Sequence, residues 1–465
     1  MASALTNGIS IVHNVLMSSD IICTINVLTS IGARFIPIDC ADNKIYTDNQ
    51  GQNKQANILK PIQSFKVLGI NTPSPSSFLS SPKNNHALGQ ELIACDMQES
   101  GTSCRLLTAI LSSCRGNFRL FGSERLEQRP MSPLTNALQE LGVKIIFEKE
   151  TGYLPFQLYD SNFCKEEITI DCDLSSQYLS ALLLIAPKLP QGLTITLGGE
   201  KAISWPYVGL TLQTLADFGI NFWVEQKDNT DRANTNKNKS LWQKVAWQDI
   251  QDAIPQQIRF YIQASTYQTG IYSVEGDWSG ASYLLAAGVL GQKPLMVQGL
   301  NINSQQGDKY ILQILQDMGA RWEISSEGVY VYPSNLKAIN IDMAYCPDLV
   351  PTVAVLMACA EGISTIYNCK HLRLKESDRL QAMALELNRA GVRVEEKADG
   401  LVIYGLGELP PNVSNIKFSV HNDHRIAMSL ALFMLSGQKI KLDDVEVVKK
   451  SFPHFWALWN DLEKA

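Results

Sequence analysis

The sequence has little that would point to a membrane, a metal ion or a nucleic acid. No apolar run among the 465 residues is long enough to span a bilayer, and the N-terminus lacks the basic stretch and apolar core of a secretory signal. The ten cysteines form no CxxC pair, and the six histidines show no metal-ligand spacing. The 40 Lys and Arg residues are outnumbered by 46 Asp and Glu, which argues against bulk binding to nucleic acid or anionic lipid. We therefore expect a cytoplasmic protein with reduced thiols, no metal or cofactor, and no membrane or nucleic-acid partner.

The composition is that of an ordinary globular protein, with 45% hydrophobic and 18% charged residues. A chain of this length exceeds what one hydrophobic core usually supports, so two large domains are expected. A boundary fits just before Tyr272, where a new strand begins, which gives domains of residues 1–271 and 272–465. Two polar segments, 41–86 and 226–243, interrupt the first domain, and we expect excursions there with little core and no chemistry.

One local pattern recurs five times and predicts the architecture. Each copy is an apolar helical stretch, a glycine and a short run typical of a strand. The glycines are Gly32, Gly142, Gly219, Gly319 and Gly391. A glycine in this position suits a left-handed residue that ends a helix and turns the chain into a strand. Five copies predict an α/β protein built of repeated units.

Three short stretches near the C-terminus concentrate cations around a carboxylate. They are Leu-Lys-Glu-Ser-Asp-Arg-Leu (374–380), His-Asn-Asp-His-Arg (421–425) and Lys-Lys-Ser-Phe-Pro (449–453). Together they supply Lys375, Arg379, Arg425 and Lys450, with Glu376 among them. Arginine grips carboxylate or phosphate with two parallel bonds, and lysine adds a point charge. If these side chains converge, they suit a small and multiply anionic substrate; if they do not, they are ordinary solvated charges.

Several helix starts carry small polar residues that suit anion binding. The segments begin at Glu99, Asp173, Asp277 and Asn422. Plain capping of the first N–H groups explains each of them alone, although the same groups can hold phosphate or carboxylate. Ser175, Ser176 and Gln177 offer more polar groups than a cap needs, which favours recognition of a phosphate and hydroxyls. Gly101 would let a ligand approach the backbone closely.

Two carboxylates are candidates for proton transfer. Asp348 precedes an apolar helix, and by itself it would be interpreted as another helix cap. Glu376 stands between Lys375 and Arg379, where a helical ion pair is the simpler explanation. In a closed and dry site, different surroundings could instead divide acid and base work between them.

Ten ordered motifs resemble those of the EPSP synthase (3-phosphoshikimate 1-carboxyvinyltransferase) family, within the enolpyruvyl transferase superfamily. They are ESGTSCR (99–105), QRP (128–130), DLSSQ (173–177), SWPY (204–207), VEGDWSGASY (274–283), QGD (306–308), CPDLVPT (346–352), LKESDRL (374–380), NDHR (422–425) and KSFP (450–453). The resemblance runs from about Ala4 to the C-terminus and is interrupted by the two polar segments. It implies an inverse α/β prism of two domains, each of three βαβαββ units, with an active site in the cleft between them.

The resemblance also implies a reaction and its residues. The family transfers the carboxyvinyl group of phosphoenolpyruvate to the 5-hydroxyl of shikimate 3-phosphate, releasing phosphate, on the route to chorismate and the aromatic amino acids. It needs no metal, and its members are usually monomers. The implied catalytic residues are Asp348 and Glu376. The residues implied for phosphoenolpyruvate are Gly101, Arg129, Gln177, Arg379, Arg425 and Lys450, and those for shikimate 3-phosphate are Ser175, Ser176, Gln177, Ser204, Tyr207, Asp348 and Lys375.

The resemblance departs from the family at the start of the chain. The family opens with a strand and a Lys-Ser…Arg loop that contacts both substrates, whereas residues 1–8 here align with the end of the helix that follows. We therefore expect a truncated, mis-started or degenerate copy with reduced activity, because losing a cation from an anion site removes transition-state binding. The same loss should expose a strand edge in the C-terminal domain.

Two alternatives to the shikimate reaction stay open at this point. The sister enzyme that acts on UDP-N-acetylglucosamine typically carries a reactive cysteine five positions before the arginine of its Arg-Pro motif, and Glu124 stands there. Ser-Ser-Gln and Asn-Asp-His-Arg also favour the shikimate enzyme. A protein that keeps the fold and binds ligands without turnover would differ by showing binding and no product.

Overall fold

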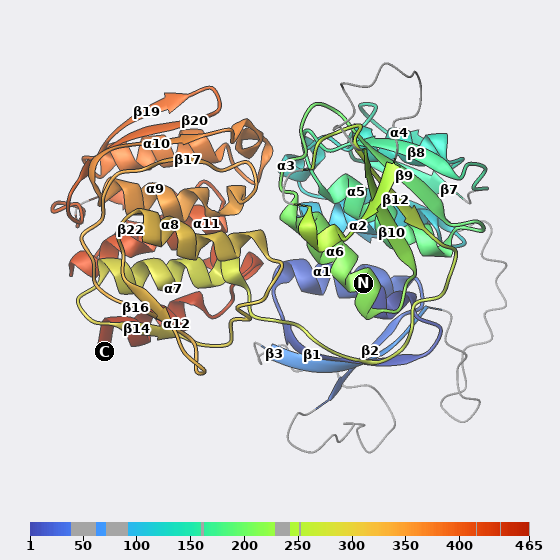
Figure 1. Cartoon of the computed structure of the whole chain (residues 1–465), viewed down its shortest axis with the longest axis horizontal. Coiled ribbons are helices and arrows are strands. Elements are labelled where there is room, and N and C mark those ends of the chain that lie inside the picture. Colours follow the sequence, from blue (N-terminus) through green and yellow to red (C-terminus); the bar gives the residue numbers. More distant parts are fainter. Residues whose placement is uncertain are drawn as a thin grey trace. The chain divides into compact units, whose positions relative to one another are not determined.

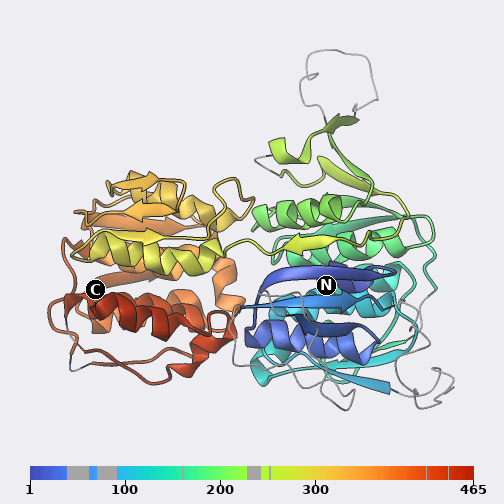
Figure 2. The same cartoon turned by 90° about the horizontal axis from the view of Figure 1, so that it is seen from below.

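The computed structural model describes residues 1–38, 62–70, 92–159, 162–227, 242–250, 253–414, 416–437 and 439–464. The chain divides into two compact units, unit 1 (Met1–Val274) and unit 2 (Glu275–Ala465). The boundary expected from the sequence, just before Tyr272, falls inside strand β13 (Ile271–Ser273), which pairs in parallel with β1 (Ile9–Leu16). Figure 2 shows β13 in yellow-green beside the blue β1. Because that pairing ties β13 to unit 1, the expected boundary is corrected to the peptide after Val274.

Unit 1 contains three sheets that enclose helices. Their strand orders are β13-β1-β3-β2, β4-β5-β7-β6 and β11-β10-β12-β9-β8. The strands not yet located are β2 (Arg34–Ile38), β3 (Ile62–Leu68), β4 (Leu92–Asp96), β5 (Asn117–Phe121), β6 (Lys144–Phe147), β7 (Phe156–Tyr159), β8 (Glu167–Asp171), β9 (Leu193–Gly198), β10 (Phe222–Lys227), β11 (Trp242–Val245) and β12 (Ile258–Ile262). The helices are α1 (Ser19–Ser30), α2 (Gly101–Ser112), α3 (Glu124–Glu127), α4 (Ser132–Glu140), α5 (Gln177–Ile185) and α6 (Pro206–Asp217).

Unit 2 has sheets of order β14-β16-β15, β17-β18-β20-β19 and β21-β22. The strands are β14 (Leu295–Val297), β15 (Trp322–Ile324), β16 (Val329–Val331), β17 (Asn340–Asp342), β18 (Glu361–Tyr367), β19 (Arg393–Lys397), β20 (Gly400–Leu406), β21 (Lys417–Phe418) and β22 (Lys441–Leu442). The helices are α7 (Trp278–Leu290), α8 (Ile311–Asp317), α9 (Val350–Ala358), α10 (Arg379–Arg389), α11 (His424–Leu430) and α12 (Phe455–Lys464). Figure 1 shows α7 to α11 side by side, with β19 and β20 on one side and β14 and β16 on the other.

The same βαβαββ order recurs in both units. In β4 to β7 and again in β17 to β20, the first two strands are parallel and the fourth lies antiparallel between the second and the third. Helices α5 and α9 are apolar on all sides, and every residue of α9 is buried. A helix of that kind is stable only when other elements surround it, which places α5 and α9 at the centres of their units. The repeated α/β prism expected from the motifs is confirmed.

The five glycine turns are also confirmed. Each glycine follows a helix and precedes a strand, with φ between +70° and +104°. Most residues with a Cβ avoid that region, so glycine lets each helix end abruptly and return as a strand. One expectation about the first polar segment is wrong. Its residues 62–68 form β3, a full strand between β1 and β2 with Phe65 and Val67 buried. Residues 41–61 and 71–86 of that segment, and residues 228–241 of the second, lie outside the described residues.

Candidate active site

Arg379 is the centre of a buried ion cluster in unit 2. Its guanidinium donates to three carboxylates: Nη1 to Asp348 Oδ1 (2.8 Å), Nη2 to Glu376 Oε2 (2.9 Å) and Nε to Asp423 Oδ2 (2.8 Å). The side chain is only 1% exposed, and Asp423 is not exposed at all. A guanidinium presents five N–H donors in a planar fork, so one arginine can hold three acceptors at once.

Three more cations surround the same carboxylates. Arg425 Nη2 lies 3.1 Å from Asp348 Oδ2, and Lys375 Nζ lies 3.7 Å from Asp348 Oδ1. Lys450 Nζ lies 3.7 Å from Glu376 Oε1. All six unit-2 residues expected from the sequence therefore converge. We call them, together with Asp423, the Arg379 cluster: Asp348, Lys375, Glu376, Arg379, Asp423, Arg425 and Lys450.

Helix starts position the arginines of the Arg379 cluster. Arg379 is the first residue of α10, and the Asp378 side chain caps that helix by accepting from the backbone N–H of Gln381 (3.1 Å). Arg425 is the second residue of α11, and its backbone N–H donates to Asp423 Oδ1 (2.9 Å). Asp423 thus caps one helix and binds the arginine that begins another. This double role fixes the spacing between the two guanidinium groups.

Two carboxylates of the cluster, Asp348 and Asp423, are held in their charged forms. Burial opposes ionisation of Asp348, but the cations of Arg425, Lys375 and Arg379 outweigh it and hold its pKa well below the ordinary value. Burial likewise opposes ionisation of Asp423, and Arg379 again prevails and lowers its pKa. The neighbouring His424 behaves differently, because burial lowers its pKa to about 3 and keeps it neutral at pH 7.

The geometry shows which partners the two carboxylates contact. The helix α9 that follows Asp348 has no side-chain cap, and the Asp348 carboxylate contacts cations instead. Glu376 does form the expected helical ion pair with Arg379, and it also lies near Lys450 from another segment. Asp277, by contrast, is an ordinary cap that accepts from the backbone N–H groups of Ser279 and Gly280.

In unit 1, the starts of three helices lie side by side. The Gln177 side chain at the start of α5 donates from Nε2 to Thr102 Oγ1 (2.8 Å) and accepts at Oε1 from Arg105 Nη1 (2.9 Å), both on α2. Thr211 on α6 donates to Ser180 on α5 (2.8 Å). Each of these contacts lies within about two turns of a helix start. The free backbone N–H groups at the starts of α2, α5 and α6 therefore gather at one end of the unit.

Arg129 lies against the start of α2. The guanidinium packs so closely on Gly101 that a Cβ there would lie 2.7 Å from Arg129 Cζ. Arg129 is 6% exposed, and the next residue, Pro130, accepts a 2.7 Å hydrogen bond from the buried Tyr178 hydroxyl. The position of the arginine therefore requires a glycine at residue 101.

The hydroxyl residues expected from the sequence lie at the starts of α5 and α6. Ser175 accepts from the backbone N–H of Gln177 (3.3 Å), and Ser176 occupies the cap position without making a side-chain cap. Ser204 is buried and has a left-handed backbone (φ 53°), and its carbonyl accepts from the backbone N–H of Tyr207 (3.1 Å). A left-handed serine costs conformational energy, which is typical of residues placed by function.

Three polar residues of these sites were missed by the residue-level interpretation. Asp423 was interpreted only as a helix cap, although it also binds Arg379. The Ser279 hydroxyl accepts from the Arg425 guanidinium, and Arg105 donates to Gln177. The sequence did contain a signal for each, since all three fall within recognised motifs. Local pattern alone gave no means of knowing which partner each would meet.

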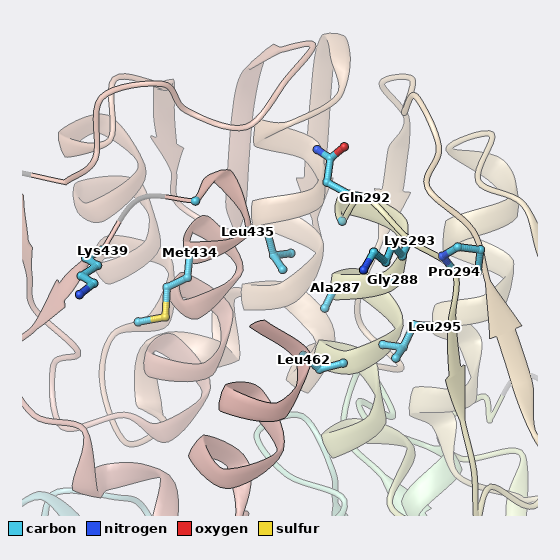
Figure 3. A pocket seen from close by; sticks show the side chains of 12 residues that line it. Ala287, Gly288, Gln292, Lys293, Pro294, Leu295, Met434, Leu435, Lys439 and Leu462 are labelled. Atoms are coloured by element: carbon cyan, nitrogen blue, oxygen red, sulfur yellow. The ribbon is translucent and has the colours of Figure 1, made fainter. Parts of the chain in front are cut away.

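A cavity of about 530 Å³ in unit 2 is not part of this site. It lies between the end of α7, β14, α12 and the 3-10 helix η7 (Ala431–Ser436). Figure 3 shows Ala287, Leu435 and Leu462 facing the same space. The Arg379 cluster contacts α7 at its other end, through Ser279. The residues that line the cavity include no carboxylate.

The described part of the chain has neither a metal-binding cluster nor a membrane-spanning helix. No group of three or more His, Cys, Asp or Glu side chains could hold a metal ion. None of the helices there combines the length and the apolar character that crossing a membrane requires.

The fold and the site define a class: a two-unit α/β prism with a buried cation cluster suited to a small, multiply anionic ligand. A model of the EPSP synthase (3-phosphoshikimate 1-carboxyvinyltransferase) family matches residues 56–254 and 248–459. A 3-phosphoshikimate 1-carboxyvinyltransferase of Syntrophobacter fumaroxidans is 37% identical over 372 residues, 78% of each chain. Another, of Methanosphaera stadtmanae, is 32% identical over 467 residues, covering 100% of this chain and 93% of the relative. The chain belongs to the EPSP synthase family.

A solved structure supports the fold. An EPSP synthase from Acinetobacter baumannii superposes with a TM-score of 0.68 at 22% identity, covering 99% of this chain and 91% of that one. The resemblance inferred from the ten motifs is thus confirmed by sequence comparison over the whole chain and by fold.

Proposed function

We propose that this protein transfers the carboxyvinyl group of phosphoenolpyruvate to the 5-hydroxyl of shikimate 3-phosphate, releasing phosphate. The observation that carries the proposal is the Arg379 cluster, in which four cations and two candidate proton-transfer carboxylates converge in a chain of the EPSP synthase family. Both substrates are multiply anionic, and fixed guanidinium groups bind such anions with two parallel bonds. One chain supplies every residue that we assign, so a monomer suffices for the reaction. We place this monomer in the cytoplasm.

The phosphoenolpyruvate anion is assigned to residues of both units. In this proposal Arg379, Arg425 and Lys450 neutralise its carboxylate and phosphate, and Arg129, Gln177 and the Gly101 backbone complete the set. The closeness of Arg129 to Gly101 supports this assignment, since it places a guanidinium beside a helix start.

Shikimate 3-phosphate is assigned to the hydroxyl-rich helix starts of unit 1 and to two residues of unit 2. Ser175, Ser176 and Ser204 would bind its phosphate, with Tyr207 alongside. Gln177, Asp348 and Lys375 would bind its ring hydroxyls. The amide of Gln177 is already oriented by Thr102 and Arg105, which supports a role in distinguishing hydroxyl donors from acceptors.

Proton transfer is assigned to the two carboxylates. Asp348 takes the proton of the 5-hydroxyl as the oxygen attacks C2 of phosphoenolpyruvate, and the methylene carbon gains a proton through Glu376 and a neighbouring lysine. The resulting tetrahedral intermediate then loses phosphate, which carries away the proton that Asp348 accepted. The methyl group returns its proton to Glu376 and the lysine, which restores the vinyl group. Before substrate binds, cations hold the pKa of Asp348 low, which makes it a weak base. Anionic substrates that draw on the same cations would raise its basicity.

The direct test is phosphate release from purified protein given phosphoenolpyruvate and shikimate 3-phosphate, together and singly. We expect release only when both are present, with enolpyruvylshikimate phosphate identified by phosphorus NMR. A folded protein that releases no phosphate would contradict the proposal. Release supported by UDP-N-acetylglucosamine in place of shikimate 3-phosphate would assign the chain to the sister reaction instead.

A second test is the substitution Gly101→Ala. The new Cβ would lie 2.7 Å from the Arg129 guanidinium, which must move away. We expect the KM for phosphoenolpyruvate to rise about tenfold, the loss typical of one weakened charge-assisted hydrogen bond, with little change for shikimate 3-phosphate. Gly209→Ala is the matched control, because its Cβ would meet only Trp247 Cζ3 at 3.9 Å. Equal effects of the two substitutions on both KM values would show that Arg129 does not bind phosphoenolpyruvate.

A further inference from the structure

Glu386 is a fully buried carboxylate outside the residues assigned above. It lies on α10 seven residues after Arg379, which places the two side chains on the same face of the helix, about two turns apart. Its side chain has no exposed surface, and Arg389 donates to both of its oxygens from the edge of the unit. A buried carboxylate is costly unless it is paired, so its other contacts are informative.

Those contacts hold the segment that leads to α11. Glu386 Oε2 accepts from the backbone N–H of Ser419 (3.2 Å), and Glu386 Oε1 lies 3.1 Å from His421 Nε2. A second carboxylate, Asp443, accepts from the Ser419 hydroxyl (2.7 Å) and from the backbone N–H of Val420 (2.8 Å). Residues 419–421 are therefore fixed by two carboxylates from two different elements.

The last residue of this segment and the one after it adopt an unfavourable backbone conformation. His421 and Asn422 both have left-handed φ angles, 52° and 53°, and neither is a glycine. Two consecutive residues of this kind persist only where the surroundings hold them. The chain then reaches Asp423, which binds Arg379, and Arg425, which binds Asp348.

We propose that Glu386 is a positioning residue: by holding the left-handed turn at His421–Asn422 it sets the placement of Asp423 and Arg425 against Arg379. The segment 419–423 lies along one face of α10 and is bound to it at two points, at Glu386 and at Arg379. If the contacts between Glu386 and residues 419–421 are lost, the left-handed turn can change conformation, and the Arg425 guanidinium loses its fixed orientation. The interpretation of that change as weaker binding of phosphoenolpyruvate rests on the proposed function.

The test compares Glu386→Gln with Glu395→Gln, which removes the same charge from the surface of β19 in the same unit. For Glu386→Gln we expect the KM for phosphoenolpyruvate to rise about tenfold, as for one lost hydrogen bond to a charged group, while the KM for shikimate 3-phosphate changes less than about twofold. Glu395→Gln should change neither. A loss of kcat in proportion to the loss of folded protein, with both KM values unchanged, would reduce Glu386 to a structural role and overturn the proposal.

Amide hydrogen exchange provides a readout that needs no turnover. Backbone amides of residues 419–427 should exchange faster in Glu386→Gln than in wild type or Glu395→Gln. Unchanged exchange there would overturn the proposal, even if the wild-type protein proves inactive and the proposed function fails. If Glu386→Gln does not fold, His421→Ala and His421→Gly replace it. Both lose the contact with Glu386, but only glycine adopts the left-handed turn readily, so the alanine variant should show the larger rise in KM.

Discussion

The substitution Asp348→Asn should lower kcat by about 10³-fold, within the range expected when a general base is removed. Asparagine keeps the size and one oxygen of the side chain, but it takes up no proton at neutral pH. The 5-hydroxyl would then have to lose its proton without the group that we assign to accept it. Single-turnover measurements with both substrates would separate this chemical step from product release.

The control for this prediction is Asp342→Asn. Asp342 lies at the end of β17 and bonds to the backbone of Ala344 and to Asn368, away from the Arg379 cluster. The Asp342→Asn variant should retain the wild-type kcat. A kcat for Asp348→Asn within tenfold of wild type would show that another group takes the proton, and Glu376 would become the first candidate to replace in turn.

Replacing Arg379 by methionine should have the largest effect on stability. The substitution leaves Asp348, Glu376 and Asp423 with one cation fewer, and Asp423 is completely buried. Breaking a buried ion pair on one side costs about 3–5 kcal/mol, and for a unit of this size that lowers Tm by on the order of 10 °C. Activity should be lost as well, since the same guanidinium is assigned to the substrate. Thermal melting followed by circular dichroism and calorimetry measures the shift.

The difference in stability between wild type and Arg379→Met should become smaller as the pH falls. The folded-state pKa values of Asp348 and Asp423 are lowered, so their contribution is present above the unfolded pKa and is lost as pH falls through the lower folded values. Without Arg379 these carboxylates are instead easier to protonate in the folded protein. The gap in Tm between wild type and Arg379→Met should therefore narrow from pH 7 to pH 4.

A suitable control is Arg393→Met, which removes a 67% exposed arginine that pairs with Glu395 and lies over the Tyr404 ring at the surface. Its Tm should stay within a degree or two of wild type, because exposed pairs contribute little. If the Tm of Arg379→Met falls no further than that of Arg393→Met, the three carboxylates must bind other partners when Arg379 is absent.

Local rules predicted a large part of the fold from the sequence. Whether a helix ends in a left-handed turn is decided by the backbone conformation of one residue, usually a glycine. All five such turns were correctly predicted. Helix starts at Ser100, Asp277 and Asp423 follow from side chains that accept from nearby N–H groups, and these were also found.

The failures share one physical cause, which is pairing between distant residues. Strand β3 lies in a segment rich in Asn, Gln and Ser, so composition concealed it; its stability comes from β1 and β2 on either side. Asp423 looked like a cap because its second partner, Arg379, is 44 residues away. The convergence of the cluster itself was inferred from motifs as a set, since no local pattern brings Asp348 to Arg425 across 77 residues.

The arrangement of Arg379 and Glu386 on α10 has a consequence for which changes the helix can accept. An α-helix advances by about 100° per residue, so the two side chains stay in phase only if six residues separate them. Inserting or deleting one residue between them would rotate Glu386 off the face that holds residues 419–423. Substitutions of Gln381 or Leu385, both exposed, leave that angle untouched. The helix is thus tolerant of composition on its outer surface and intolerant of any change in length, which is how a spacer between two binding points behaves.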